Sequence, residues 1–319
     1  MIARTGCWPG RIDFEHPSLV RFLLVTCIFC TSGCDGALDA VEEPAAGQPA
    51  RRIITLAPHL TELVFTAGAG DRLVGVVEYS DYPPESRLLP RVGDAFRLDY
   101  EAIAALKPDL ILGWQSGTPV AVLDRLTELG YRVLTLEPGR LTTIAEHLRF
   151  IGQLADSAPA AATAAAEYER DLEELRGKHK NASTLSVFYQ ISWQPLFTIN
   201  KRHVIGEAIE ICGGRNIFAE LTELSPAVSL EAVLEQAPQV IVASQFDSRK
   251  NLAETELANW SKWKNIPAVR DDNLFLLDAD LLARPSIRIL GGVRALCDTL
   301  DVVRGRSPAN DSVRQISNE

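Results

Sequence analysis

Short apolar runs alternate with helical patterns along most of the chain. The runs "RRIITLAP", "RLVGVV", "DLILGW" and "YRVLTLE" are separated by stretches such as "DYEAIAALK" and "PVAVLDRLTELG", whose apolar positions recur at helical spacing. The same alternation returns after residue 184, where "TLSVFYQI", "QVIVAS" and "NLFLLDAD" are predicted to be strands. Strands that alternate with helices in this way are typical of a parallel sheet covered by helices on both faces.

One helix–strand unit occurs twice. "EAIAALKPDLILGW" begins at Glu101 and "EAVLEQAPQVIVAS" begins at Glu231, with the Glu, Ala, Pro and one Ile at matching positions. In each copy the helix starts at a favourable N-cap, Asp99 or Ser229, and a proline ends it about two turns later. The repeat therefore predicts two similar lobes.

The segment between the two halves, "PAAATAAAEYERDLEELR", favours a helix over about residues 159–176, which Gly177 could end. This helix lies within a connecting region at 142–183, between an N-terminal lobe at 51–141 and a C-terminal lobe at 184–304. We predict an α/β fold: two similar three-layer lobes with mainly parallel central sheets, joined by one long rigid helix, with a ligand cleft between the lobes.

The beginning of the chain reads as an export signal. Arginines precede the apolar run "FLLVTCIFCTSGC", which suits a signal-peptide core and is too short to span a bilayer. The residues before Cys34 resemble the lipobox of bacterial lipoproteins. We therefore predict a signal peptide at 1–33, lipidation of Cys34 and a flexible tether at 34–50, with plain secretion as the alternative. The tail at 305–319 is predicted to be disordered.

Composition and charge limit the class of protein that this chain can be. The chain has 319 residues, of which 46% are hydrophobic and 23% charged, as in a globular protein with a sizeable core. Its net charge of −10 argues against a nucleic-acid partner, which needs a basic face. In an oxidising compartment the last two cysteines, Cys212 and Cys297, are expected to form a disulfide.

The motifs of the common enzyme classes are missing. The sequence has no Gly-x-Ser-x-Gly elbow, P-loop, HExxH or GxGxxG after a strand, and no close cluster of metal-ligating residues. We predict a protein that is not an enzyme and holds no metal or cofactor. A divalent-metal receptor remains an alternative, because His59 follows the first strand, His203 starts a helix in the other half, and both could face a cleft.

Several segments resemble a known family. "GVVEYSDYPP", "LKPDLILGW", "FTINK", "EICGGRNIF" and "ARPSIRI" are similar to segments of the periplasmic substrate-binding proteins of ABC importers that have a helical backbone between their lobes. The likeness covers roughly residues 51–303 and is greatest to the members that bind cobalamin (vitamin B12).

The resemblance implies a function and a location. A monomer in the periplasm, anchored to the inner membrane through Cys34, would capture cobalamin or a related corrinoid and deliver it to an ABC permease and its ATPase. A ferric-siderophore or haem receptor is the alternative, because Arg202 and Arg284 could meet siderophore oxygens or haem propionates.

Candidate ligand contacts lie after the predicted strands, because ligands of open α/β sheets bind beyond the carboxyl ends of the strands. Tyr79 follows "LVGVV", Trp114 closes "LILGW", and Asp280 to Arg284 follow "LFLLDA". Ala95, Ser225 and Leu281 stand where the cobalamin-binding members have tryptophans. From position and resemblance together, we predict ligand contacts at Tyr79, Phe96, Trp114, Phe197, Asp280, Leu281, Leu282, Ala283 and Arg284.

Two further pairs of residues have simpler interpretations. Glu101 and Glu231 each fall in a first helical turn, where the helix dipole alone favours a carboxylate. The resemblance implies a second role for both, docking onto arginines of the permease. Trp260 and Trp263 have the spacing of residues that pack from one helix face into the core.

Overall fold

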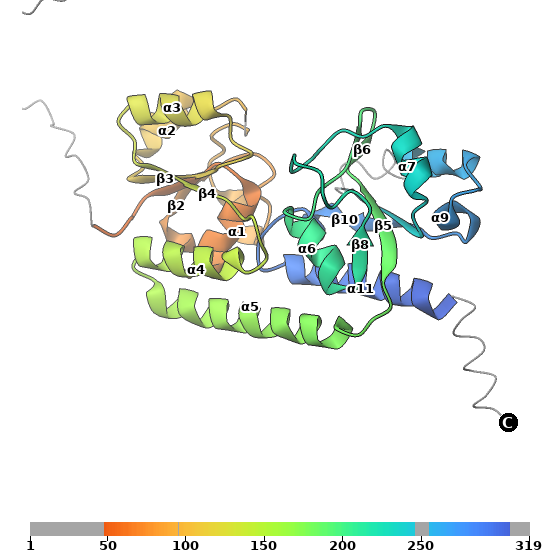
Figure 1. The fold of residues 1–319 in the computed structure, drawn as a ribbon. Helices are drawn as coiled ribbons and strands as arrows, with labels where there is room; N and C mark the ends of the chain where they lie inside the picture. Colours follow the sequence, from red (N-terminus) through yellow and green to blue (C-terminus); the bar gives the residue numbers. More distant parts are fainter. Residues whose placement is uncertain (1–47, 95, 246–254, 307–319) are drawn as a thin grey trace, which may run out of the picture. The chain divides into compact units, whose positions relative to one another are not determined.

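The computed structural model describes residues 48–94, 96–245 and 255–306. Figure 1 shows their arrangement. The predicted signal peptide, the lipidation of Cys34, nearly all of the predicted tether, Ala95 and the tail from residue 307 lie outside the described residues.

The N-terminal lobe is built on a four-stranded sheet with the strand order β2-β1-β3-β4, and every pair of neighbouring strands is parallel. Its strands are β1 (Ile53–Thr55), β2 (Leu73–Val76), β3 (Leu110–Trp114) and β4 (Val133–Leu136). Its helices are α1 (Pro58–Thr66), α2 (Tyr100–Leu106) and α3 (Val120–Glu128), with short 3₁₀ helices at η1 (Gly70–Arg72) and η2 (Pro84–Leu88).

The C-terminal lobe has a second parallel four-stranded sheet, in the order β10-β9-β5-β8. Its strands are β5 (Leu185–Gln190), β8 (Gly214–Asn216), β9 (Val240–Gln245) and β10 (Leu274–Asp278), with a small hairpin of β6 (Ser192–Trp193) and β7 (Leu196–Phe197). Its helices are α6 (Val204–Ile211), α7 (Leu230–Gln236), η4 (Asn259–Lys262), α9 (Pro267–Arg270) and α10 (Ala279–Leu282).

The two sheets have the same topology. When β5, β8, β9 and β10 are matched to β1, β2, β3 and β4 in chain order, both sheets read second, first, third, fourth. The prediction of two similar α/β lobes with parallel central sheets is confirmed.

The repeated helix–strand unit is also the same in both lobes. Helices α2 and α7 each have seven residues, and the side chains of Asp99 and Ser229 accept hydrogen bonds from backbone N–H groups of the first turn. Both helices end on a left-handed residue, Lys107 with φ 45° and Ala237 with φ 42°. The proline that follows each of these residues disfavours continuation of the helix.

Three helices complete the fold: α4 (Thr143–Leu154), α5 (Ala158–His179) and α11 (Ile289–Arg306). Helix α5 contacts α4 and α1 as well as α6 and α11, and Figure 1 shows it running below both sheets, with α4 above one part of its length and α11 above another. Gly177 lies inside α5 rather than at its end.

The two lobes share one hydrophobic core. A single cluster of buried side chains includes Leu63 and Leu112 from the N-terminal lobe, Val187 and Leu296 from the C-terminal lobe, and Leu172 from α5. The apolar face of α5 therefore packs against both lobes at once.

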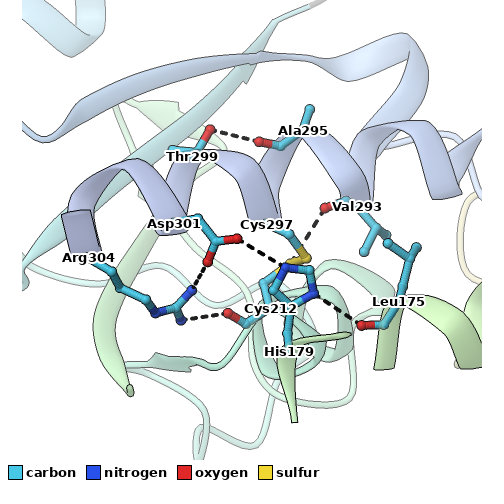
Figure 2. Close-up of a disulfide and its surroundings, with 9 residues drawn as sticks. All are labelled: Leu175, His179, Cys212, Val293, Ala295, Cys297, Thr299, Asp301 and Arg304. Atoms are coloured by element: carbon cyan, nitrogen blue, oxygen red, sulfur yellow. Dashed lines mark hydrogen bonds and ion pairs between the residues drawn. A yellow bond between two sulfur atoms is a disulfide. The ribbon is translucent and has the colours of Figure 1, made fainter. Parts of the chain in front are cut away.

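The end of α5 is fixed next to the two cysteines (Figure 2). The Sγ atoms of Cys212 and Cys297 lie 2.02 Å apart, which is disulfide distance, and join the end of α6 to α11. The imidazole of His179 lies 3.1 Å from the carbonyl oxygen of Leu175 and 3.2 Å from the carboxylate of Asp301. These contacts hold the C-terminal ends of α5 and α6 against α11.

We expect the cysteine pair to contribute strongly to stability. The two residues are 85 positions apart, so a bridge restricts a long loop of the unfolded chain. Replacing both by alanine (Cys212→Ala, Cys297→Ala) should lower the free energy of unfolding by about 2–5 kcal/mol, measured by urea denaturation without reductant. Reductant should destabilise the parent protein by a similar amount and leave the variant unchanged. A parent protein insensitive to reductant would show that the pair is not bridged.

Candidate functional site

A pocket of about 830 Å³ lies where the two lobes face each other. This volume is within the range of small-molecule sites. On the N-terminal side its walls follow the carboxyl ends of β3 and β4, where the open-sheet rule expects a ligand. The lining residues are Gln115, Ser116, Glu137, Gly139 and Arg140 from the N-terminal side, and Lys201, Arg202, Glu207, Glu210 and Leu224 from the C-terminal lobe.

Trp114 is the last residue of β3, directly before the pocket residues Gln115 and Ser116. Its ring meets the ring of His59 edge to face, with centroids 5.1 Å apart. Within the described part of the chain, neither Trp114 Nε1 nor His59 Nε2 has a hydrogen-bond partner, although both atoms are buried.

Both histidines that the sequence placed near a cleft are held neutral. Burial, together with the nearby charges of His147 and Arg284, lowers the pKa of His59 to about 3. Burial also lowers the pKa of His203 to about 4, and its Nδ1 accepts a hydrogen bond from the backbone N–H of Ile205 at 3.2 Å.

Tyr79 and Phe96 are exposed aromatic residues on loops that follow β2. Their exposed fractions are 69% and 72%, which is high for rings of this size. Tyr79 adopts φ 65°, an uncommon conformation for a residue other than glycine. The loop of Phe96 is fixed by the carboxylate of Asp94, which accepts hydrogen bonds from the backbone N–H groups of Phe96 at 2.7 Å and Arg97 at 2.8 Å. These hydrogen bonds lower the pKa of Asp94.

Arg284 joins the two lobes at the end of α10. Its guanidinium lies 2.7 Å from the carboxylate of Asp280 in its own lobe and 2.6 Å from that of Asp81 in the N-terminal lobe. Burial raises the pKa of Asp280, and the charge of Arg284 opposes that shift. Because Asp81 is two residues from Tyr79, the fold brings three of the predicted ligand contacts into one neighbourhood: Tyr79, Asp280 and Arg284.

The other predicted ligand contacts lie in different surroundings. Phe197 is half-buried in the β6–β7 hairpin, paired with Ser192. Leu281 and Ala283 are half-buried, whereas the side chain of Leu282 is fully buried in the shared core.

The predicted docking glutamates are exposed, whereas the two tryptophans that were assigned to the core are buried or half-buried. Glu101 and Glu231 are exposed in the first turns of α2 and α7. Trp260 is fully buried and Trp263 is half-buried in a second apolar cluster, so their role is packing; they lie at a 3₁₀ turn rather than on an α-helix.

Sequence reasoning did not find the charged residues that connect the lobes. Glu62 and Glu207 are buried acids within the apolar helices α1 and α6, and their partners are Arg288, Arg176 and the backbone of Leu141. The only local signal was a glutamate inside an otherwise apolar run, "TELVF" or "GEAIEI".

The described residues contain neither a membrane-spanning helix nor a cluster of metal ligands. Among residues 48–94, 96–245 and 255–306, no helix has both the length and the apolar character needed to cross a bilayer. The same residues contain no group of three or more His, Cys, Asp or Glu side chains placed to hold a metal ion.

Two similar parallel α/β lobes that face each other across a pocket define a two-lobed binding protein. The Periplasmic binding protein family model matches residues 53–281, and the chain belongs to this family.

Comparison with individual proteins points in the same direction. The chain is 35% identical over 260 residues to the vitamin B12-binding protein of Vibrio campbellii, covering 81% of this chain and 92% of that one. Among solved structures it is similar to the periplasmic vitamin B12-binding protein BtuF of Vibrio cholerae, with a TM-score of 0.72 and 37% identity over 80% of this chain and 98% of that one. The haem-binding protein RhuT from Roseiflexus sp. RS-1, at 22% identity and a TM-score of 0.70 over 80% of this chain and 99% of that one, shares the fold.

The lowered pKa of His59 predicts a loss of stability in acid. Histidine in an unfolded chain has a pKa of about 6.5, whereas folded His59 has a pKa of about 3. Between these values the unfolded chain binds more protons, so stability falls as the pH drops from about 6.5 towards about 3. His59→Leu should reduce the loss of unfolding free energy between pH 7.5 and pH 5, measured by urea denaturation. His203 acts in the same direction and is unchanged in both proteins, so an equal loss in parent and variant would contradict this account.

Proposed function

We propose that this protein is the periplasmic substrate-binding component of an ABC importer, with cobalamin or a related corrinoid as its ligand. The observation that carries the proposal is the similarity to vitamin B12-binding proteins, which covers about four-fifths of this chain and nearly the whole length of those proteins. A protein of this kind captures and releases its ligand unchanged, so it is not an enzyme and cobalamin is cargo rather than a cofactor.

The chemistry of the cleft agrees with such a ligand. A corrinoid is a broad, largely apolar ring with amide groups at its edge. Gln115 and Ser116 line the pocket and can pair with amides. Trp114 directly precedes them, and the exposed rings of Tyr79 and Phe96, which are not part of the pocket lining, could cover apolar faces of a ligand.

The pocket lining has no excess of positive charge that would select a ligand with several carboxylates. Its three acids, Glu137, Glu207 and Glu210, are matched in number by three basic residues, Arg140, Lys201 and Arg202. The guanidinium of Arg284, which could have met haem propionates or siderophore oxygens, is already paired with Asp81 and Asp280. An anionic ligand would have to displace these carboxylates, whereas an amide-rich ligand would not. Haem and ferric siderophores remain the second candidate class, since haem-binding proteins share this fold.

Delivery requires a permease and its ATPase. Glu101 and Glu231 are exposed at equivalent positions of the two lobes, so together they present two carboxylates to a partner. A permease built from two similar halves could bind both through arginines, and complementary charges of this kind mainly steer the encounter and fix the orientation. Anchoring through Cys34 would keep the protein near that partner as a monomer until it docks.

Removal of the exposed rings tests the ligand. Mature protein should show quenching of tryptophan fluorescence on addition of cobalamin, and haem or a ferric siderophore should have little effect. The double variant Tyr79→Ala, Phe96→Ala should bind cobalamin about 10-fold or more weakly, because two rings lose apolar contact, and should keep its stability because both rings are exposed. Phe150→Ala, which removes a ring from α4, is the matched control and should bind normally. If only haem or the ferric siderophore changes the tryptophan fluorescence, the ligand belongs to the second candidate class and is not cobalamin.

A second double variant tests docking. Glu101→Ala with Glu231→Ala should abolish or strongly reduce cobalamin uptake by cells while ligand affinity stays unchanged, because both side chains lie on α2 and α7 and not in the pocket. Uptake by cells and fluorescence titration of the purified variant are measured separately. Glu128→Ala, on the exposed side of α3, serves as the control. Normal uptake by the double variant would exclude these residues as the docking pair.

A further inference from the structure

Two buried glutamates occupy equivalent positions in the two lobes. Glu62 lies in α1, which follows the first strand of its sheet, and Glu207 lies in α6, which follows the corresponding strand β5 after the hairpin. In both segments, "TELVFTAG" and "GEAIEICG", the glutamate is followed six positions later by a glycine. These glycines, Gly68 and Gly213, have nearly equal backbone angles, φ 76° and φ 72°.

Glu62 binds the segment that leads into α11 of the opposite lobe. Its carboxylate accepts hydrogen bonds from Arg288 Nη2 at 2.5 Å, Arg288 Nε at 2.9 Å and Ser286 Oγ at 2.5 Å. Arg284 Nη1 lies 3.6 Å away. The side chain of Glu62 is only 1% exposed, so these bonds replace its contact with water. We call Glu62, Arg284, Ser286 and Arg288 the Glu62 cluster.

Glu207 makes the reciprocal contact. Its carboxylate accepts a hydrogen bond from the backbone N–H of Leu141 at 2.7 Å, in the segment that leads from β4 into α4 of the opposite lobe. It also accepts one from Arg176 Nη2 of α5 at 2.7 Å, and Arg140 Nη2 lies 3.6 Å away. We call Glu207, Arg140, Leu141 and Arg176 the Glu207 cluster. Since α4 and α11 each follow the last strand of their sheet, the two clusters are related by the same internal symmetry as the lobes.

We propose that Glu62 and Glu207 are positioning residues that together limit how far the two lobes open. Separation of the lobes would pull each carboxylate from its partners in the other lobe and leave a charge with too few hydrogen bonds. A buried ion pair adds little net stability compared with apolar packing, so its clearest effect is to fix one arrangement. Arg140 and Glu207 line the pocket, so the Glu207 cluster acts at the candidate ligand site.

The expected effect on ligand release rests on the proposed function, whereas the restraint on separation of the lobes does not. If the clusters hold the cleft at one width, weakening either of them should let a bound corrinoid escape faster. Amide exchange in the segments that face the two carboxylates should rise as well, and this can be measured without knowing the ligand.

Hydrogen–deuterium exchange followed by mass spectrometry tests the restraint on the full chain. Glu62→Gln keeps the shape of the side chain but removes its charge, and should speed amide exchange about 10-fold or more in residues 284–290. Glu207→Gln should do the same in residues 139–144. Glu128→Gln, which changes an exposed glutamate paired with Arg125, is the matched control and should leave both segments unchanged.

The pattern of exchange separates a restraint from a general effect on stability. Faster exchange confined to the segment facing the altered carboxylate supports the proposal. An equal increase in the core strands β1 and β5, or no increase in either segment, would overturn it. The variant Glu62→Gln with Arg288→Gln should behave like Glu62→Gln alone, because both changes break one contact. Should Glu62→Gln fail to fold, Ser286→Ala removes one bond of the same cluster; a smaller local increase is then expected, and none would overturn the proposal.

Stopped-flow release of cobalamin separates this proposal from the proposed function. The parent protein should release cobalamin more slowly than either glutamine variant. If the parent does not bind cobalamin while the exchange pattern is as expected, the function is wrong and the restraint stands. If the parent binds cobalamin and both variants release it at the parental rate with unchanged exchange, the restraint is wrong and the function stands.

Discussion

The apolar face of α5 is the constraint on which the rest of the structure depends. Its buried residues, among them Ala165 and Leu172, belong to the same core cluster as strands of both sheets. Moving one lobe away from the other along this face would expose apolar surface, at a cost of about 25 cal/mol for each Å². The lobes are thus joined by a packed core, in which a side chain cannot shift without disturbing its neighbours.

Polar contacts between the lobes accompany this shared core, and those of Glu207 lie at the pocket. Apolar side chains cannot donate hydrogen bonds to a buried carboxylate. Glu62 and Glu207 therefore need polar partners close by. Those partners come from the opposite lobe or from α5, and they fix the distance across the pocket. With such a restraint, small movements would suffice for ligand capture in the proposed function. Both lobes would then reach the proposed permease in a nearly constant arrangement, which suits the proposed docking through Glu101 and Glu231.

Local signals were enough to predict most elements. The N-caps at Asp99 and Ser229 and the prolines after each helix act over a few residues, so the repeated unit was placed correctly in both lobes. Gly177 was misjudged as a helix stop because its helix continues to His179, whose ring bonds to Asp301 on α11. A glycine lowers helix stability by only about 1 kcal/mol, and a tertiary contact can offset that.

The sequence by itself determined the two-lobed α/β architecture, the connecting helix and the aromatic residues near the strand ends, because periodicity, caps and strand endings are encoded in neighbouring residues. The tertiary structure alone decided which charges meet. Glu62 and Arg288 are separated by 226 positions, and nothing near either residue indicates the other. A contact between residues so far apart in the chain exists only after both lobes have packed on α5. For that reason the buried carboxylates between the lobes had to be found in the folded molecule.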